Sequence, residues 1–245
     1  TEERESFFMW KTDIRDTILY EDQAIMVCHK PAGLAVQNAR IGTMDMESAL
    51  KNYLAEKNTE GIPYLGIINR LDQPVEGLLV FAKTSRAAAG LSRQMEKNKI
   101  EKVYLAVSDR IPPEKEGQLE DYLKKDGRNN SSVVAESGTK GAKKAKLFYH
   151  AAGTIPDSRT ETGLRCLIQI RLETGRHHQI RVQMAHAGMP LIGDRKYYPE
   201  DKSGLSLGLC SSVLRFLHPE SGKKMEFRAE PKGNAFEGFD MGKCC

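Results

Sequence analysis

Short apolar segments of strand length outnumber helical patterns along this chain, and the two kinds do not alternate strictly. In the clearest of these segments, residues 164–172, every second residue is apolar. This period of two is typical of a β-strand whose two faces meet different surroundings. Parallel α/β folds alternate strands with helices, and that order is missing here. The sequence therefore predicts an α+β fold with a mixed, largely antiparallel β-sheet flanked by helices.

Apolar periodicity also places the individual elements. Further strands are predicted at residues 18–20, 24–28, 64–68, 78–83, 103–108, 213–217 and 225–228. Helices are predicted from Thr43 through Leu54, from Ser85 as N-cap to about Asn98, and from about His177 to Ala187. Residues 126–141 are rich in Gly, Asn and Ser, so we expect a loop or hairpin there.

Length and composition limit the class of protein. With 245 residues, no internal repeat and no break in composition, we expect one domain spanning residues 1–245. The sequence has no apolar run of transmembrane length and no secretory signal, so we expect a cytoplasmic protein with no membrane partner. The scattered cysteines form no CxxC pair and predict reduced thiols, with Cys166 in the core. They are Cys28, Cys166, Cys210, Cys244 and Cys245.

The positive charge of the chain is mild but unevenly distributed. The formal net charge is +4, from 37 Lys and Arg against 33 Asp and Glu, which does not by itself identify a nucleic-acid-binding protein. One segment gathers basic residues with few acids between them: Lys124, Lys125, Arg128, Lys140, Lys143, Lys144 and Lys146. Such a segment is either a solvated loop or hairpin, or a surface that contacts phosphates.

Familiar cofactor and metal signatures are missing from the sequence. There is no P-loop, no GxGxxG after a strand, no HExxH and no GxSxG. His177 and His178 are adjacent, and on a helix their side chains would point about 100° apart. His186 does not complete a metal-ligand face with either of them. We therefore expect chemistry that uses neither a metal nor a cofactor.

One candidate catalytic carboxylate is Asp72, which follows Arg70 and Leu71 between two apolar strand patterns. The turn there is formed with Gln73 and Pro74. A carboxylate at this place is held by a rigid scaffold and can face a cleft, where catalytic groups are found. The other interpretation is that Asp72 only caps the turn and that Arg70 is its partner on the surface. Local sequence leaves both open.

A second candidate segment is the helix predicted from His177. Arg181 shares one face of this helix with His177 and Met184. An arginine on a buried helix face needs a carboxylate partner. Asp72 is a plausible partner for Arg181, although a single sequence does not establish the contact.

Several motifs, taken in order, resemble a known family. They lie at residues 21–33, 68–83, 102–107, 141–145 and 175–194, and include Asn69-Arg70-Leu71-Asp72 and Gly175-Arg176-His177-His178-Gln179-Ile180-Arg181-Val182. Each motif is weak alone, but the ordered set resembles the RluA-type pseudouridine synthases over about residues 18–228. The resemblance implies the pseudouridine synthase fold with an active-site cleft. It also implies isomerisation of uridine in RNA without a cofactor.

The resemblance also implies roles for particular residues. Asp72 corresponds to the catalytic carboxylate, Tyr104 to an active-site tyrosine, and Arg181 to the basic residue that pairs with the carboxylate. Tyr104 lies on the strand face opposite Val103, Leu105 and Val107, so it need not belong to the core. The implied substrate-binding residues are Arg70, Leu71, Arg176, His178, Gln179 and Ile180. The candidate contacts to the RNA backbone are Lys124, Lys125, Lys143 and Lys144.

Two departures from the family pattern keep other functions open. Asn69 stands where the family commonly has His, and Val75-Glu76-Gly77 stands where Thr-Ser-Gly is common. The alternatives are an inactive RNA-binding protein of the same fold, acting as a chaperone, and a hydrolase that pairs Asp72 with Glu76. Intact Asp72, Tyr104 and Arg181 argue against the first. We expect an active monomer that acts on structured rRNA or tRNA, with no obligate protein partner and no N-terminal RNA-binding module of the S4 type.

Overall fold

A single β-sheet organises the molecule. The structure is a computed structural model and describes residues 13–38, 43–57 and 61–243. The strands found in these residues are β1 Ile18–Glu21, β2 Ile25–Lys30, β3 Gly66–Ile67, β4 Glu76–Ala82, β5 Glu101–Ser108, β6 Glu116–Asp126, β7 Ser131–Ala135, β8 Lys143–Pro156, β9 Leu164–Leu172, β10 Leu209–Leu217 and β11 Lys224–Arg228. The α-helices are α1 Met46–Lys57, α2 Ser85–Glu96 and α3 Gln179–His186, and short 3-10 helices lie at Ile14–Thr17, Asn234–Phe236 and Met241–Lys243.

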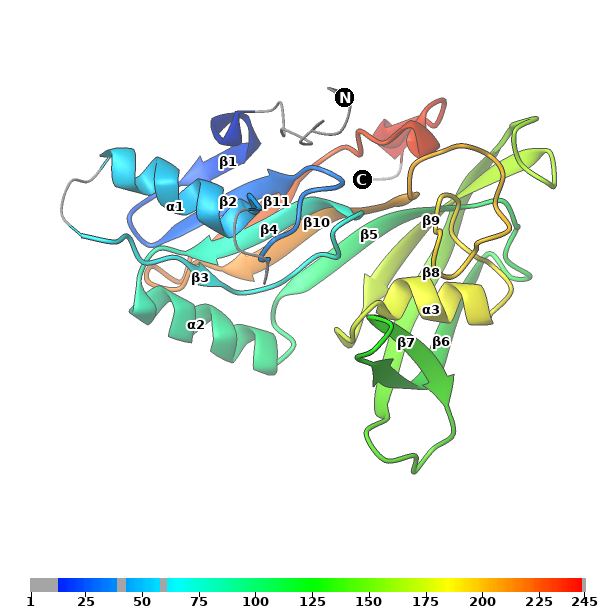
Figure 1. Cartoon of the computed structure of the whole chain (residues 1–245), viewed down its shortest axis with the longest axis horizontal. Helices are drawn as coiled ribbons and strands as arrows, with labels where there is room; N and C mark the ends of the chain where they lie inside the picture. The colour runs from blue at the N-terminus through cyan, green and yellow to red at the C-terminus, as the bar shows by residue number, and fades with distance from the viewer. Residues whose placement is uncertain (1–12, 39–42, 58–60, 244–245) are drawn as a thin grey trace, which may run out of the picture.

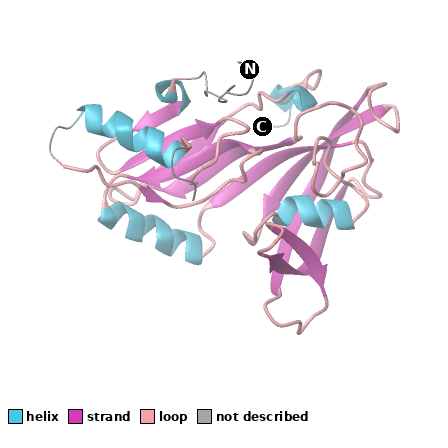
Figure 2. Cartoon of the chain, viewed as in Figure 1, coloured by secondary structure: helices cyan, strands magenta, loops and turns pink. Residues whose placement is uncertain are grey.

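The sheet is mixed and largely antiparallel, which confirms the predicted α+β class (Figure 2). Its strand order is β1-β2-β4-β10-β5-β9-β8-β6-β7, with β11 paired to β10 and β3 paired to β4. Among the described strands, only β4 and β10 run parallel to each other. Because all other neighbours are antiparallel, short connections suffice between most of them.

Strand β4 lies in the interior of the sheet and carries the chain away from the Asp72 segment. All of its residues are buried, as expected for a continuous apolar run between two covered faces. Gly77 has a φ of +119°, and a Cβ atom there would collide with the backbone of Ser211 on β10. Glycine is therefore required where β4 begins beside β10.

The helices cover different parts of the sheet. In Figure 1, α1 and α2 flank the end that contains β1, β2 and β4, while α3 lies beside β6, β7 and β8. Met46 of α1 and Met184 of α3 belong to one apolar core, together with Tyr104 of β5. Leu91 of α2 packs in a separate core on Leu78 of β4. The sheet thus separates the α1 and α3 side from the α2 side.

Several boundaries differ from the prediction. Helix α3 begins at Gln179, because His178 has left-handed backbone angles with a φ of +52°. His177 is therefore outside the helix, and the predicted shared face of His177, Arg181 and Met184 is wrong. In α2 the N-cap is Thr84 and not Ser85, since the Thr84 side chain accepts a hydrogen bond from the backbone N–H of Ala87.

The long strands β6 and β8 were not predicted, and residues 126–141, expected to be a loop or hairpin, contain the turn and second strand of a hairpin whose first strand precedes them. Strands β6 and β7 form this hairpin, and β6 also pairs along its length with β8. Leu123 of β6, Ala145 of β8 and Val182 of α3 form a small apolar core that seats the hairpin on α3. The segment predicted as a strand at residues 64–68 is shorter, with only Gly66–Ile67 paired.

Two further expectations can be checked on the described residues. Cys166 is fully buried, as predicted, and Cys28, Cys166 and Cys210 form no disulfide. Cys244 and Cys245 lie outside the described residues. No helix in the described part of the chain is both long enough and apolar enough to span a membrane.

Candidate active site

Asp72 lies in the connection between β3 and β4, which is bonded to the turn after β2. The carbonyl of Gln73 accepts hydrogen bonds from the Gly33 N–H at 2.9 Å and from Lys30 Nζ at 3.0 Å. The side chain of Gln73 in turn donates to the Gly33 carbonyl at 3.0 Å. The Val75 N–H donates to the Asp72 carbonyl at 3.0 Å and closes a turn. The Asp72 side chain is held in place by this backbone and remains 25% exposed.

Arg181 pairs with Asp72, so the contact proposed from the sequence is present. Nη1 of Arg181 donates to Oδ2 of Asp72 at 3.1 Å. The same guanidinium also donates through Nε and Nη2 to the carboxylate of Asp194, at 2.8 and 2.7 Å. Burial lowers the pKa of Arg181, but the two carboxylates outweigh it and the net shift is upward. The cation is therefore permanent and shared between two acids.

Asp194 is the main residue that the sequence interpretation missed. Its side chain is fully buried, and Oδ1 also accepts hydrogen bonds from the N–H groups of Lys196 and Tyr197, at 3.0 and 3.2 Å. Its place in the third motif is the one signal that would have drawn attention to it. Because Asp194 is anchored to the backbone, it fixes the orientation of the Arg181 side chain.

His178 approaches the same oxygen of Asp72. Its Nε2 lies 3.5 Å from Asp72 Oδ2, and its Nδ1 lies 2.9 Å from the hydroxyl of Tyr197. Burial lowers the pKa of His178 to about 4, although the charge of Asp72 opposes the shift, so the ring is neutral near pH 7. His177 stacks on His178 with ring centroids 3.8 Å apart. The two rings are parallel, and not 100° apart, because the helix begins after them.

Tyr104 forms the wall of the pocket from β5. It is buried, and burial followed by the charge of Asp72 raises its pKa, so the hydroxyl stays protonated. The prediction that Tyr104 need not belong to the core is wrong, because both faces of β5 are buried from Val103 onward. Its side chain nevertheless lines the cleft that contains Asp72.

The cleft is small, with a volume of about 70 Å³, and it gathers every residue predicted to be catalytic or to bind substrate. It is lined by Arg70, Leu71, Asp72, Val75, Tyr104, Leu172, Arg176, His178, Gln179, Ile180, Arg181 and Leu209. Apolar side chains line part of the cleft, and Arg181 and His178 approach Asp72. Within the described residues, no three His, Cys, Asp or Glu side chains lie close enough to hold a metal ion.

The segment before α3 is tied to β8 through Gln179. The side-chain oxygen of Gln179 accepts hydrogen bonds from the Thr174 hydroxyl at 2.8 Å and from the Arg176 N–H at 2.9 Å. Its amide nitrogen donates to the Lys146 carbonyl at 3.1 Å. Nε of Arg176 donates to the Lys144 carbonyl at 2.9 Å, while its side chain is exposed at the mouth of the cleft. Gln179 therefore helps to fix the backbone of Arg176 beside the cleft.

The four lysines predicted to contact the RNA backbone lie outside the cleft. Lys124 and Lys125 are on β6, and Lys143 and Lys144 are on β8, at the end of the sheet where these two strands pair. All four are exposed. Nζ of Lys144 forms an ion pair with Glu120 at 2.7 Å. These four lysines form a basic strip along this end of the sheet, with Lys124 and Lys144 on one face and Lys125 and Lys143 on the other.

Glu76 does not share the cleft with Asp72, contrary to the paired-carboxylate interpretation. Its carboxylate is buried and accepts hydrogen bonds from the backbone N–H groups of Lys232 and Gly233, at 3.0 and 2.9 Å. Glu76 therefore anchors the C-terminal segment. Asn69 is also buried, and its side-chain oxygen accepts a hydrogen bond from the Val80 N–H at 3.3 Å. Both residues that depart from the family pattern thus accept hydrogen bonds from backbone N–H groups in the interior of the protein.

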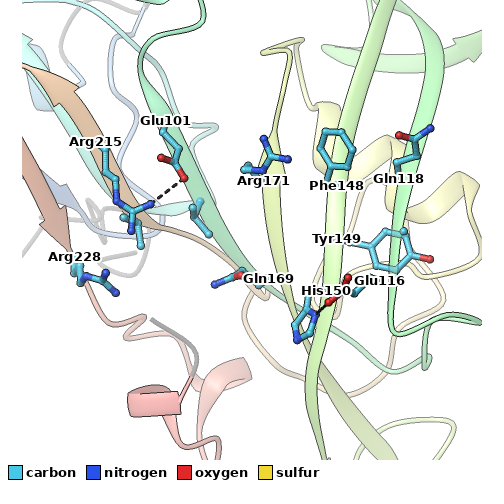
Figure 3. Close-up of a pocket in the computed structure, with 13 residues that line it drawn as sticks. Glu101, Glu116, Gln118, Phe148, Tyr149, His150, Gln169, Arg171, Arg215 and Arg228 are labelled. Carbon is cyan, nitrogen blue, oxygen red and sulfur yellow. Dashed lines mark hydrogen bonds and ion pairs between the residues drawn. The ribbon is translucent and has the colours of Figure 1, made fainter.

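A larger groove, of about 810 Å³, lies on the other face of the sheet (Figure 3). Val103 lines this groove, whereas the next residue, Tyr104, lines the cleft, and successive strand residues point to opposite faces. In the groove, Arg215 forms an ion pair with Glu101 at 2.9 Å (Figure 3). The groove contains none of the predicted catalytic residues.

Comparison with known proteins gives three findings. A family model described as RNA pseudouridylate synthase matches residues 24–186. Ribosomal large subunit pseudouridine synthase D of Zymomonas mobilis is 34% identical over 231 residues, which cover 89% of this chain and 70% of that protein. An uncharacterized RNA pseudouridine synthase of Bacillus subtilis is 32% identical over 218 residues, which cover 86% and 68%.

Among solved structures, the chain is similar to Human RNA Pseudouridylate Synthase Domain Containing 4. The TM-score is 0.71, with 89% of this chain and 90% of that chain covered. The sequence identity is 18%, so this similarity concerns the fold alone.

Proposed function

Because the chain belongs to the RNA pseudouridylate synthase family, we propose that Asp72 is the carboxylate that starts the reaction. The chain is an RNA pseudouridine synthase of the RluA type, an isomerase that converts uridine in RNA to pseudouridine. The observation that carries the assignment of Asp72 is its contact with Arg181 inside a cleft that also contains Tyr104. The buried guanidinium of Arg181 orients the carboxylate of Asp72.

The reaction exchanges one bond of the uridine for another. The bond between N1 and the ribose C1′ breaks, the uracil turns, C5 bonds to C1′, and the proton on C5 leaves while N1 gains one. Attack on C1′ and assistance to glycal formation both require an ionised carboxylate beside the ribose. The contacts of Asp72 with Arg181 and His178 use Oδ2, which makes Oδ1 the oxygen directed to the substrate.

The other residues of the cleft hold the detached base. Tyr104 is proposed to stack on the uracil and, through its protonated hydroxyl, to take part in proton transfer at C5. Ile180 and Leu71 supply apolar contact, which retains the base without offering it a competing hydrogen bond. Arg70 is exposed at the edge of the cleft and is proposed to fill the space that the flipped uridine leaves in the RNA.

Recognition of the RNA is proposed to combine the cleft with the basic strip of Lys124, Lys125, Lys143 and Lys144. Arg176 stands between them, since its side chain lines the cleft and donates to the backbone of Lys144. Phosphate contacts of this kind supply affinity without reading the sequence. The relative from Zymomonas mobilis is named for the large ribosomal subunit, and we propose structured ribosomal RNA as the substrate class here too.

We also propose that residues 1–245 act as one catalytic domain, as a monomer in the cytoplasm. The described strands form one continuous sheet, and the relative from Zymomonas mobilis aligns with 89% of this chain, which supports one domain. Light scattering after size exclusion, with and without RNA, checks the monomer. A stable dimer in the absence of RNA would contradict it.

The test of Asp72 is conversion of uridine in RNA by the purified chain. RNA labelled with tritium at C5 of uridine should release its label, and equally so in EDTA. Asp72→Asn should release none, while RNA affinity changes by less than about tenfold because phosphate contacts dominate binding. Asp22→Asn is the matched control, since Asp22 is a turn carboxylate outside the cleft that accepts the N–H groups of Ala24 and Ile25.

The results also separate the competing functions. Full activity of Asp72→Asn would remove the proposed role of this residue. Binding of RNA by the wild type without any conversion, across a broad panel of RNAs, would favour the chaperone. Release of free labelled uracil, in place of tritium from C5, would favour the hydrolase with paired carboxylates.

A further inference from the structure

The hydroxyl of Tyr197 joins the β6–β7 hairpin to the active site. Tyr197 lies in the connection between α3 and β10, three residues after Asp194. Its oxygen accepts a hydrogen bond from the Ser132 N–H of β7 at 2.8 Å. The same oxygen lies 2.9 Å from Nδ1 of His178, whose other ring nitrogen faces Asp72. Three separate elements thus meet at one phenol.

The direction of these hydrogen bonds follows from the donors available. A backbone N–H only donates, so the Tyr197 oxygen is the acceptor toward Ser132. The single proton of the hydroxyl is then free to point to His178, with Nδ1 as its acceptor. Burial keeps the His178 ring neutral, and a neutral imidazole carries one proton. That proton is consequently on Nε2, the nitrogen that lies 3.5 Å from Oδ2 of Asp72.

Tyr197 also contacts the second partner of Asp72. The guanidinium carbon of Arg181 lies 5.2 Å from the centroid of the Tyr197 ring, a cation–π distance. The backbone N–H of Tyr197 donates to Asp194, which holds the other side of the same guanidinium. Both groups that approach Oδ2 of Asp72 are therefore supported by this one residue.

We infer that Tyr197 is a positioning residue of the reaction, which sets the His178 tautomer and supports Arg181 so that Oδ2 of Asp72 is held and Oδ1 faces the uridine. The inference rests on the proposed role of Asp72. It assigns His178 to the carboxylate and not to the substrate. Tyr197 itself does not line the cleft, so it acts through its neighbours.

The same contacts couple the hairpin to the active site. Ser132, which binds Tyr197 through its N–H, is paired across the hairpin with Lys125 of the basic strip. The Ser132 hydroxyl also donates to the carbonyl of His177 at 2.7 Å. The hairpin that carries Lys125 is therefore bonded to the same residues that hold Asp72.

The first test is the tautomer of His178 in the wild-type protein without RNA. Nitrogen-15 chemical shifts of the histidine rings, assigned with a His178→Gln variant, should show a neutral ring protonated on Nε2. Tyr197→Phe keeps the aromatic ring beside Arg181 but removes the hydroxyl, and should give a mixture of tautomers. Ser132→Ala retains the backbone N–H and should leave the tautomer unchanged. A wild-type ring protonated on Nδ1 would overturn the inference, whatever the variants do.

The second test is kinetic and uses Tyr198→Phe as the matched control. Tyr198 is the adjacent tyrosine, and its hydroxyl donates to Asp109 outside the cleft at 2.9 Å. Tyr197→Phe should lower kcat by at least about tenfold and change KM by less than about threefold, because orientation is lost but binding is not. Tyr198→Phe should keep the wild-type kcat. In a His178→Gln background, Tyr197→Phe should lower kcat by clearly less than in the wild type.

These outcomes are distinct from failure of the proposed function. A wild type that converts no uridine, yet shows the expected tautomer, would overturn the catalytic proposal and leave the hydrogen-bond network in place. An active wild type with unchanged kcat in Tyr197→Phe would overturn the positioning role alone.

Discussion

The guanidinium of Arg181 is divided between two carboxylates with different surroundings. Asp194 is fully buried and takes two of its donors, whereas the partly exposed Asp72 takes one. A buried arginine whose charge is not balanced by carboxylates destabilises the folded protein. The contacts of Arg181 with Asp194 and Asp72 balance its charge. The division also leaves Asp72 less constrained than Asp194. That difference suits a structural acid on one side and a reactive acid on the other.

Replacement of Asp194 by Asn should therefore impair the reaction more than RNA binding. Arg181 would lose its bidentate partner and turn its free donors to Asp72, so we expect kcat to fall by at least about tenfold and KM to change by less than about threefold. Asp157→Asn is the control, because it breaks a buried ion pair with Arg165, at 2.6 Å, outside the cleft. The measurement is the kcat and KM of the wild type and of both variants, from steady-state kinetics normalised to the amount of folded protein. Equal kcat values for Asp194→Asn and the wild type would contradict this role.

At the residue scale, sequence alone identified the members of the cleft but not all of their supports. Asp72, Tyr104 and Arg181 were found from ordered motifs, and they meet in one cleft. Asp194 and Tyr197 were not singled out, because their importance depends on how the chain after α3 folds back onto the helix. No local period encodes such a contact. His178 was misplaced for a related reason, since a helical pattern does not reveal a left-handed residue before the first turn.

At the scale of elements, buried segments were easier to predict than exposed ones. Strand β4 and helix α1 carry apolar residues where the core requires them, so their patterns were visible. Strands β6 and β8 have one face in solvent and carry many charged residues there, including Glu120 and Lys144. A polar, half-exposed strand resembles a loop in sequence. Only pairing with its neighbours reveals it.

The basic strip beside the hairpin should contribute to RNA affinity and not to chemistry. Replacing Lys124 and Lys125 together by Gln should raise KM about three- to tenfold at physiological salt and leave kcat unchanged, because RNA that binds fewer lysines releases fewer counterions. The dependence of log affinity on log salt should become shallower by about 0.7 to 0.9 for each phosphate that is no longer neutralised. Lys224→Gln on β11, an exposed lysine far along the sheet, is the control. An unchanged salt slope would exclude the strip from the interface.

At the scale of the whole molecule, the active site is assembled from distant parts of the chain. Asp72 and Arg181 are 109 residues apart in sequence, and each is seated on a different half of the sheet. The cleft therefore exists only when both halves are paired through β5, β9 and β10. Global stability and catalytic geometry are linked for this reason.

Stability should fall as the pH is lowered from about 6.5 to 4. Burial lowers the pKa of both His29 and His178 from 6.5 to about 4. Between these values the unfolded chain binds more protons than the folded one, so the free energy of unfolding rises with pH across this window. The stability that the two neutral histidines contribute is lost as the pH falls to about 4. Urea denaturation at several pH values measures the slope. His29→Gln and His178→Gln should each flatten it, whereas replacement of the exposed His186 should not, and an unaltered slope in both variants would contradict the prediction.

The most direct test of the central claim is a map of pseudouridine in RNA from cells that naturally express this protein, compared with cells that lack it. At least one uridine, in structured ribosomal RNA on our proposal, should lose its modification when the protein is absent. Wild-type protein should restore that site, and Asp72→Asn at equal abundance should not. An identical map without the protein, or full restoration by Asp72→Asn, would contradict the account.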